Sequence, residues 1–379
     1  MPKTAELVAT PYRFDGSTEK ARRFFEKGLG EAFSRIRETE NEAYPLTVYY
    51  AFKQSETDAD SDDTSRSGMN ANGIAIASTG WETMLEGLLH AGFSVHGTWP
   101  MRSERGARVI SIGANALASS IILVCRPRPG DARPAARKDF LNALKRELPA
   151  ALKELQRGNI APVDLAQAAI GPGMAVFSRY SKVLESNDLP MRVRTALQLI
   201  NQTLDEVLAE QEGEFDSDTR FAVAWFEQYG MGQGKFGEAD VLARAKNTSV
   251  RGLDEADILE ARGGNVRLLR RDELPDKWNP HTDHRLSVWK VTQHLIHAVM
   301  EGGGAQAASE LLDAVGSDYG EKARDLAYRL YATSERRKWT QDAFAYNTLV
   351  TEWHDIDRGV EGVRERARAT VRQSTLMDG

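Results

Sequence analysis

The sequence has little of what would place it in a membrane or outside the cell. Cys125 is the single cysteine, which excludes intramolecular disulfides and multi-cysteine zinc sites and favours a reducing cytoplasm. The longest apolar run, residues 116–125, has the size of a strand and falls short of the roughly 18–20 residues that span a bilayer. The N-terminus has no basic stretch followed by an apolar one, so no signal peptide is predicted. We therefore expect no membrane partner.

Neither basic nor acidic residues are in large excess. The 49 Lys and Arg residues face 55 Asp and Glu residues, giving a net charge of −6. This balance argues against a protein that coats nucleic acid indiscriminately, but it leaves room for a local basic patch. At about 150 residues per domain, the 379 residues predict two or three domains.

Residues 1–127 are predicted to form an α/β layer. The expected elements are a helix at 17–40, a strand at 44–54, an acidic loop at 55–72, a helix at 81–91, and strands at 93–100 and 119–126. Strands that alternate with helices indicate an α/β layer, and the last two strands suggest an antiparallel pair at one edge. Three strands are few for a free-standing domain, so we infer an incomplete sheet whose other strands lie outside this chain.

The rest of the chain is predicted to be mainly helical. Residues 128–138 read as a basic linker, residues 139–357 as a helical domain, and residues 358–379 as a charged tail that frays. The expected helices span 138–155, 163–184, 191–212, 217–229, 236–246, 250–256, 286–301, 305–315, 321–337 and 340–353.

The segment 236–271 interrupts this helical pattern. A helix, a turn at Asn247 and Thr248, an N-cap at Ser249 and a second short helix precede two strands joined at 263–265. This is the element order of a winged helix, although a helix pair with an adventitious hairpin would give the same pattern.

Residues 240–271 contain seven basic residues against five acids, a modest excess; the basic residues are Arg244, Lys246, Arg251, Arg262, Arg267, Arg270 and Arg271. Cations on a recognition helix and wing suit DNA phosphates, and polar residues at the helix start suit hydrogen bonds to them. The alternative is a solvated charged face on a helical subdomain. The candidate DNA-binding residues are Lys246, Asn247, Thr248, Ser249, Arg251, Arg267, Arg270 and Arg271.

Two glycine patterns favour structural interpretations. Residues 232–237 fit G-x-G-x-x-G, but they follow a predicted helix, whereas a dinucleotide loop follows a strand. An interhelical turn is therefore expected. Gly171-Pro172-Gly173 is predicted to break a helix.

Histidine and cysteine patterns also favour structural interpretations. His281 with His284, and His294 with His297, lack further nearby ligands, so structural or surface histidines are expected rather than a metal site. Cys125 lies in an apolar strand, where thiols are usually inert. No nucleophile elbow and no Walker-type lysine loop occurs.

Two long stretches resemble a known family. The first combines LVATPYRF at 7–14 with VYYAFKQ at 48–54, STGWE at 78–82, GTWPMR at 97–102 and NALASS at 115–120. The second runs from GNIAPVDLAQAAIGPG at 158–173 through WFEQYG at 225–230 to AKNT at 245–248. Together they resemble the C-terminal half of the large prokaryotic adenine-specific DNA methylases that carry an N-terminal domain of unknown function. The resemblance covers roughly residues 5–355.

The resemblance implies a partial Rossmann-like methyltransferase sheet in the N-terminal third, followed by a mainly α domain with a winged-helix-like unit. The strand at 44–54 would match the fifth strand of that sheet, and the last two strands its terminal antiparallel pair. In the family, the cofactor turn D-P-F-x-G-x-G and the catalytic D-P-P-Y motif lie upstream of the position that matches residue 1. Neither string occurs here, and Asn279-Pro280-His281 lacks the second proline and the aromatic residue.

The resemblance also implies a role. The full-length family would use S-adenosylmethionine as its cofactor, but no cofactor is expected to bind to this chain alone. The expected partners are DNA and either the missing N-terminal half or a partner subunit. Methylation of adenine N6 requires a flipped base stacked on an aromatic side chain, with its amino group polarised by the catalytic loop. Because this chain lacks that loop and the cofactor turn, we expect it to position DNA and to be inactive alone. Tyr50, Arg102 and Asn115 are candidates for lining the target pocket, and each also has a structural interpretation.

The alternative function is that of a non-catalytic DNA-binding or scaffold subunit of a prokaryotic defence complex, within restriction-modification or phage defence.

Overall fold

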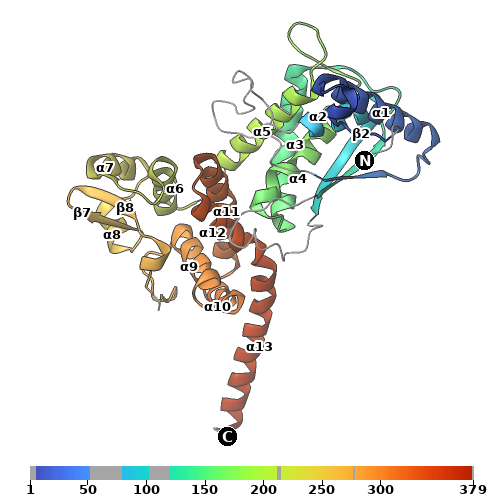
Figure 1. Cartoon of the computed structure of the whole chain (residues 1–379). Coiled ribbons are helices and arrows are strands. Elements are labelled where there is room, and N and C mark those ends of the chain that lie inside the picture. Colours follow the sequence, from blue (N-terminus) through green and yellow to red (C-terminus); the bar gives the residue numbers. More distant parts are fainter. Residues whose placement is uncertain (1–5, 52–78, 102–119, 211–214, 276–277, 378–379) are drawn as a thin grey trace. The chain divides into compact units, whose positions relative to one another are not determined.

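The computed structural model describes residues 6–51, 79–101, 120–210, 215–275 and 278–377 (Figure 1). Within these residues the chain divides into two compact units. The first contains the described residues up to Leu155 together with Asp164–Asp205, and the second contains Gln156–Val163 and the described residues from Glu206 onward. The expected boundary at 128–138 is therefore not where the two units divide.

The elements follow in chain order. The described helices are α1 (Thr18–Thr39), α2 (Thr79–His90), α3 (Arg137–Arg157), α4 (Pro162–Ser178), α5 (Val193–Glu210), α6 (Ser217–Tyr229), α7 (Phe236–Ala245), α8 (Val250–Glu255), α9 (Val288–Met300), α10 (Ala305–Val315), α11 (Ser317–Arg337), α12 (Thr340–Thr351) and α13 (Trp353–Met377), with 3-10 helices at Pro11–Phe14 and Arg271–Glu273. The described strands are β1 (Leu46–Ala51), β2 (Phe93–Met101), β3 (Ser120–Pro127), β4 (Ala135–Ala136), β5 (Val183–Leu184), β6 (Gly234–Lys235), β7 (Leu259–Arg262) and β8 (Asn265–Leu268).

Short polar side chains set the N-terminal ends of several helices. Ser17, Asp216, Ser249 and Ser287 each accept a hydrogen bond from the backbone amide three residues further on. This satisfies one of the amides that the first turn leaves without a helical partner. The caps at Ser17 and Ser249 were predicted from the sequence and are confirmed.

The sheet of the first unit has the order β1-β3-β2, and β3 is antiparallel to both neighbours. β1 and β2 therefore run parallel to each other, and the chain between them contains α2. The expected antiparallel pairing of the last two strands is confirmed. In the described part of the chain, β1 and β2 are the two edges of this sheet.

One face of this sheet is packed against helices. Ile121, Leu123 and Cys125 alternate along β3 and are at most 1% exposed. On the same face, the ring centroids of Tyr50 and Trp81 of α2 lie 5.2 Å apart. The hydrophobic core of the unit therefore lies between this face and the helices.

The opposite face carries large exposed apolar side chains. The register aligns Tyr49 of β1 with Ile122 of β3 and Trp99 of β2 in one row across the sheet. Tyr49 is 68% exposed, Trp99 is 57% exposed and Met101 is 42% exposed. Contiguous exposed apolar surface of this kind commonly marks an interaction site.

The predicted helix break at Gly171-Pro172-Gly173 is wrong, because α4 continues through all three residues. Pro172 has no amide hydrogen to donate to the carbonyl of Ala168, four residues earlier. The hydroxyl of Thr98 on β2 donates to that carbonyl over 2.8 Å and accepts from the amide of Gly171 over 3.1 Å. A buried side chain from the sheet thus replaces the missing helical hydrogen bond.

The predicted basic linker at 128–138 is tied into the first unit. Arg128 donates to the carbonyls of Leu89 and Tyr180 over 3.1 and 3.3 Å. β4 pairs with β5 in parallel, and α3 begins directly after β4. These contacts explain why the division between units lies elsewhere.

Cys125 is fully buried in β3, as the sequence predicts for an inert thiol. Burial, together with the nearby charge of Glu40, raises the pKa of this thiol to about 12. Because the thiolate is the reactive form, the folded protein should protect Cys125 from alkylating reagents.

The second unit is built around α9, whose residues Val291, Leu295 and Ile296 are fully buried. Helices α6, α10, α11 and α12 pack on it, and α13 packs along α10. The expected helices at 217–229 and 305–315 have the same bounds in the structure. The tail expected to fray after residue 357 is instead the continuation of α13, where Arg364 pairs with Asp313 of α10 over 2.7 Å.

Candidate nucleic-acid interface

The segment from α6 to β8 contains the elements predicted for 236–271 in the predicted order (Figure 1). Asn247 adopts a left-handed conformation with φ of 60° between α7 and α8, which asparagine tolerates better than most residues. Gly263 and Gly264, with φ of 60° and 77°, join β7 to β8 in the two-residue turn that such positive angles allow. The predicted turn and hairpin are therefore confirmed.

A third strand in this segment was not predicted from the sequence. Within the G-x-G-x-x-G stretch, β6 pairs with β8, so the small sheet has the order β6-β8-β7. A Cβ at Gly234 would lie 2.6 Å from the Trp225 ring, which explains why glycine stands there. The stretch follows α6, as predicted, and as an edge strand it does not have the strand–loop–helix setting of a cofactor loop.

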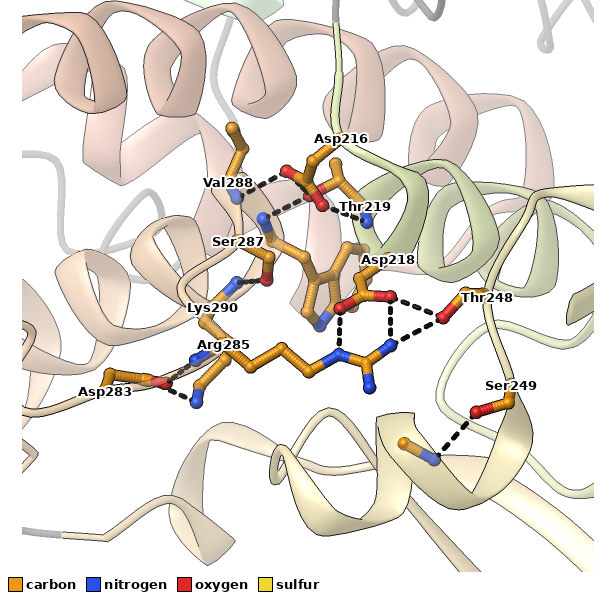
Figure 2. A network of polar contacts seen from close by, with 12 residues as sticks. Asp216, Asp218, Thr219, Thr248, Ser249, Asp283, Arg285, Ser287, Val288 and Lys290 are labelled. Atoms are coloured by element: carbon orange, nitrogen blue, oxygen red, sulfur yellow. Dashed lines mark hydrogen bonds and ion pairs between the residues drawn. The ribbon is translucent and has the colours of Figure 1, made fainter.

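A polar network lies behind the α7–α8 turn (Figure 2). The carboxylate of Asp218 on α6 accepts two hydrogen bonds from Arg285, over 2.6 and 2.9 Å, and one from Thr248 over 2.5 Å. Arg285 also donates to the Thr248 hydroxyl over 2.8 Å. The network therefore ties the turn before α8 to α6 and to the segment that precedes α9.

Asp218 is ionised within this network. Burial is the largest influence and acts to raise the pKa of Asp218, but hydrogen bonds from Arg285 and Thr248 and the charge of Arg285 outweigh it and lower that pKa. Because the depressed pKa favours the folded state, this stability is present above the ordinary value of 3.8 and is lost as the pH falls below it.

A second part of the network joins α6 directly to α9. Asp216 accepts from the amides of Thr219 over 2.8 Å and Val288 over 3.0 Å. The hydroxyl of Thr219 accepts from the amide of Trp289 over 2.9 Å. The same side chains thus accept hydrogen bonds from backbone amides in the first turns of both helices, which fixes α6 relative to α9.

Four of the eight candidate DNA-binding residues make contacts that hold this segment together or tie it to its neighbours. Thr248 belongs to the polar network, and Ser249 caps α8. Arg267 is 19% exposed and pairs with Glu260 over 2.7 Å and with Glu273 over 2.8 Å. Arg271 donates to Gln293 and Asp342 over 2.9 and 3.1 Å and is 16% exposed. These residues hold the segment together and are poorly placed to contact phosphate.

The other four candidates lie at the surface. Asn247 and Arg270 are exposed and Lys246 is partly so, whereas the Arg251 side chain is 89% exposed and pairs with Glu255 over 2.7 Å. An exposed ion pair of this kind contributes little to stability, so its arginine remains able to exchange partners.

Two further basic side chains lie at the hairpin: Arg262, which was counted in the basic excess but was not among the candidate DNA contacts, and Lys235, which sequence reasoning missed. Arg262 and Lys235 both align with Asn265 of β8, so they lie in one row at the hairpin turn, and both are exposed. The cross-strand register that brings them together depends on β6, which the sequence did not reveal.

Of the three target-pocket candidates, one lies within the described residues. Tyr50 is half-buried and packs against Trp81 on the helix-covered face of the first sheet. Its position supports the structural interpretation. Arg102 and Asn115 lie outside the described residues.

The histidine pairs lie in two settings. His281 and His284 are exposed, whereas His294 is buried and its ring stacks on Trp278. Among the residues that the structure describes, no three His, Cys, Asp or Glu side chains come together in a way that would hold a metal ion.

Comparisons with known proteins add one match. Residues 216–376 match a family model described as a domain of unknown function (DUF8807). The match begins at the N-cap of α6 and includes the whole polar network. No curated protein matches the chain, and no solved structure matches it. None of the helices in the described part of the chain has the length and apolar character that a membrane span requires.

Proposed function

We propose that this chain is the C-terminal portion of an S-adenosylmethionine-dependent, adenine-specific (N6) DNA methyltransferase. In this proposal the first unit is the end of a Rossmann-like methyltransferase sheet, and the α6–β8 segment is a winged-helix-like DNA-binding unit. The chain binds and positions DNA in the cytoplasm, and a separate polypeptide or an upstream part supplies the chemistry.

The observation that carries the proposal is a three-stranded sheet that has large exposed apolar side chains on the face opposite its core, among the described residues. Tyr49 and Trp99 are more than half exposed on that face, and β1 is an edge strand in the described part of the chain. Both ladders of this sheet are antiparallel, but β1 and β2 run parallel with α2 between them in the chain, and parallel strands joined by helical crossovers belong to sheets with both faces covered. The exposed apolar face and the edge strand fit a sheet that is continued and covered by the missing half.

The basic side chains around α8 and the hairpin support the DNA-binding part of the proposal. Arg251, Arg262 and Arg270 are exposed, and Lys235 lies in the same row as Arg262. Contacts to DNA phosphates fix the register and orientation of a protein on the duplex, but they carry no information about the base sequence. Residues 232–237 form a turn and an edge strand after a helix and do not fit a cofactor loop. In this proposal the missing part binds the cofactor.

The experiment that tests the proposal is reconstitution. The chain is co-expressed with a polypeptide that carries D-P-F-x-G-x-G and D-P-P-Y strings, and transfer of labelled methyl groups to adenine N6 is measured. We expect transfer from the pair and none from either chain alone. DNA binding without methyl transfer in every reconstituted pair would contradict the proposal and favour the non-catalytic subunit.

A matched pair of variants links that activity to the exposed apolar face. Trp99→Ser removes an exposed aromatic side chain from the face and should weaken association with the complementary polypeptide by at least about tenfold. Tyr12, which is 59% exposed and lies outside the sheet, provides the control Tyr12→Ser. Equal effects of the two substitutions would show that the exposed sheet face is not part of the interface with the complementary polypeptide.

DNA affinity should depend on salt through the surface arginines. If about three to five phosphates are contacted, log affinity falls against log salt with a slope of about −3 to −5. Because Arg267 is held by two glutamates, the informative variant is Arg251→Ala, Arg262→Ala, Arg270→Ala, which should reduce the slope by about 2 to 3. Fluorescence anisotropy of a labelled duplex between about 50 and 200 mM salt measures it.

The control removes the same charge elsewhere. Arg22, Arg23 and Arg35 on α1 have side chains that are 60%, 74% and 81% exposed, and their triple alanine variant should leave the slope unchanged. A slope that the Arg251, Arg262 and Arg270 substitutions do not change would exclude this segment from DNA contact.

A further inference from the structure

A cavity of about 720 Å³ lies in the second unit, between the segment before α9, the C-terminal half of α9, and α10. Its described lining includes Trp278, His294, His297, Glu301 and Glu310. The described lining lies within the 216–376 match, and none of it belongs to the hairpin or to α8.

His294 is the unusual residue of this cavity. It is 5% exposed, and its Nε2 atom is buried without a hydrogen-bond partner. Its ring stacks on Trp278 with centroids 4.1 Å apart and planes 9° from parallel. A buried polar atom without a partner costs free energy, so its retention beside a cavity points to a ligand that completes the hydrogen bond.

The imidazole of His294 carries no charge near neutral pH. Burial, with smaller contributions from the charges of Lys290 and His297, lowers the pKa of His294 to about 3, although Asp283 acts in the opposite direction. A neutral imidazole with its proton on Nδ1 presents Nε2 as an acceptor.

Two carboxylates stand at the open side of the cavity. The side chains of Glu301 and Glu310 are 53% and 57% exposed, and His297 Nδ1 lies 3.4 Å from Glu301 without forming a hydrogen bond. None of the described lining residues is a lysine or arginine. Outside the lining, Arg366 lies 4.0 Å from Glu310, and the ammonium of Lys290, which pairs with Asp283, lies 5.8 Å from the Trp278 ring centroid. The described lining therefore carries two acidic side chains, no basic one, and the indole of Trp278.

We propose that this cavity binds a guanidinium group, with Glu301 and Glu310 pairing with its charge, the Nε2 atom of His294 accepting one of its N–H groups, and Trp278 forming its aromatic wall. A guanidinium presents five N–H donors in one plane and no acceptor, which suits a site lined by acceptors. Planar cations are also attracted to indole rings. The ligand is either a free guanidino compound or an arginine side chain of a protein segment.

Titration calorimetry of the full chain with agmatine tests this proposal. We expect a dissociation constant on the order of 0.1 to 1 mM for so small a ligand. Cadaverine has a similar length but carries an ammonium in place of the guanidinium, and it should bind at least about fivefold more weakly. Equal affinities for the two probes, or no agmatine binding, would overturn the proposal.

Variants localise the binding. Glu301→Gln with Glu310→Gln should weaken agmatine binding about tenfold, since a charge-assisted pair is stronger than a neutral one. Glu321→Gln with Glu361→Gln removes the same charge from exposed positions outside the cavity and should leave the affinity unchanged. Equal losses in both double variants would show a general charge effect and exclude the cavity.

A second substitution separates binding from folding. His294→Leu removes the unpaired nitrogen, so it should lower agmatine affinity at least about fivefold without lowering the unfolding temperature at neutral pH. Unchanged affinity in a folded His294→Leu protein would contradict the assignment. Comparison of agmatine with a Gly-Arg-Gly amide then identifies the source: tighter binding of the peptide indicates a protein segment, and tighter binding of agmatine indicates a free compound.

Discussion

Gly171→Ala is expected to destabilise the first unit by about 3 kcal/mol, because a Cβ atom at this position would overlap the backbone and hydroxyl of Thr98. The new atom would lie 2.5 Å from Thr98 Oγ1 and 2.9 Å from the Gly97 carbonyl carbon. α4 would have to move away from β2, and the hydroxyl that replaces the missing donor of Pro172 would lose its two partners.

Cys125 provides the measurement for this substitution. It is the single cysteine, it is fully buried in β3, and its pKa of about 12 keeps it protonated, so thiol labelling in urea reports unfolding of the first unit. Gly30→Ala is the matched control. Gly30 also lies inside a helix but has open space around it, so alanine should stabilise by about 0.5 to 1 kcal/mol. Labelling midpoints that shift equally in both variants would contradict the account of α4.

Acid is expected to destabilise the second unit through His294 as the pH falls below about 6.5. The unfolded chain takes up a proton on this residue near 6.5, whereas burial holds the folded pKa at about 3. Protons therefore favour the unfolded state throughout this window. At about 1.36 kcal/mol per pH unit over about 3.5 units, the full effect is on the order of 5 kcal/mol at pH 3.

Hydrogen exchange of the α9 amides at several pH values measures this effect. His294→Leu should flatten the dependence between about pH 6.5 and 4, whereas substitution of the exposed His281 by leucine should leave it unchanged. A pH dependence that persists in the His294→Leu protein would show that other groups carry it.

The sequence predicted the local structure well where local signals decide it. The serine caps, the turn at Asn247 and the Gly263-Gly264 hairpin each follow from backbone preferences of the residues themselves. It failed at Gly171-Pro172-Gly173, because the residue that repairs the helix is Thr98, which lies far earlier in the chain. A long-range partner of this kind leaves no periodic trace in the sequence.

The candidate DNA-binding site was predicted in part. The arginine count in 240–271 could not distinguish Arg251, which is exposed, from Arg271, whose partner Asp342 is distant in sequence. Arg262 and Lys235 became neighbours only through the pairing of β6 with β8. Charge composition identified the segment, whereas tertiary pairing decides which charges remain available.

We propose that the missing methyltransferase half, as a separate polypeptide or an upstream part, completes the sheet of the first unit, and hydrogen exchange of β1 tests this most directly. The chain is measured alone and together with the polypeptide that carries the cofactor and catalytic strings. The account predicts that alternate amides of Leu46–Ala51, which face away from β3, exchange rapidly in the chain alone and slowly in the pair, with methyl transfer appearing in the same sample. Unchanged exchange of these amides in a mixture that nevertheless transfers methyl groups would contradict it.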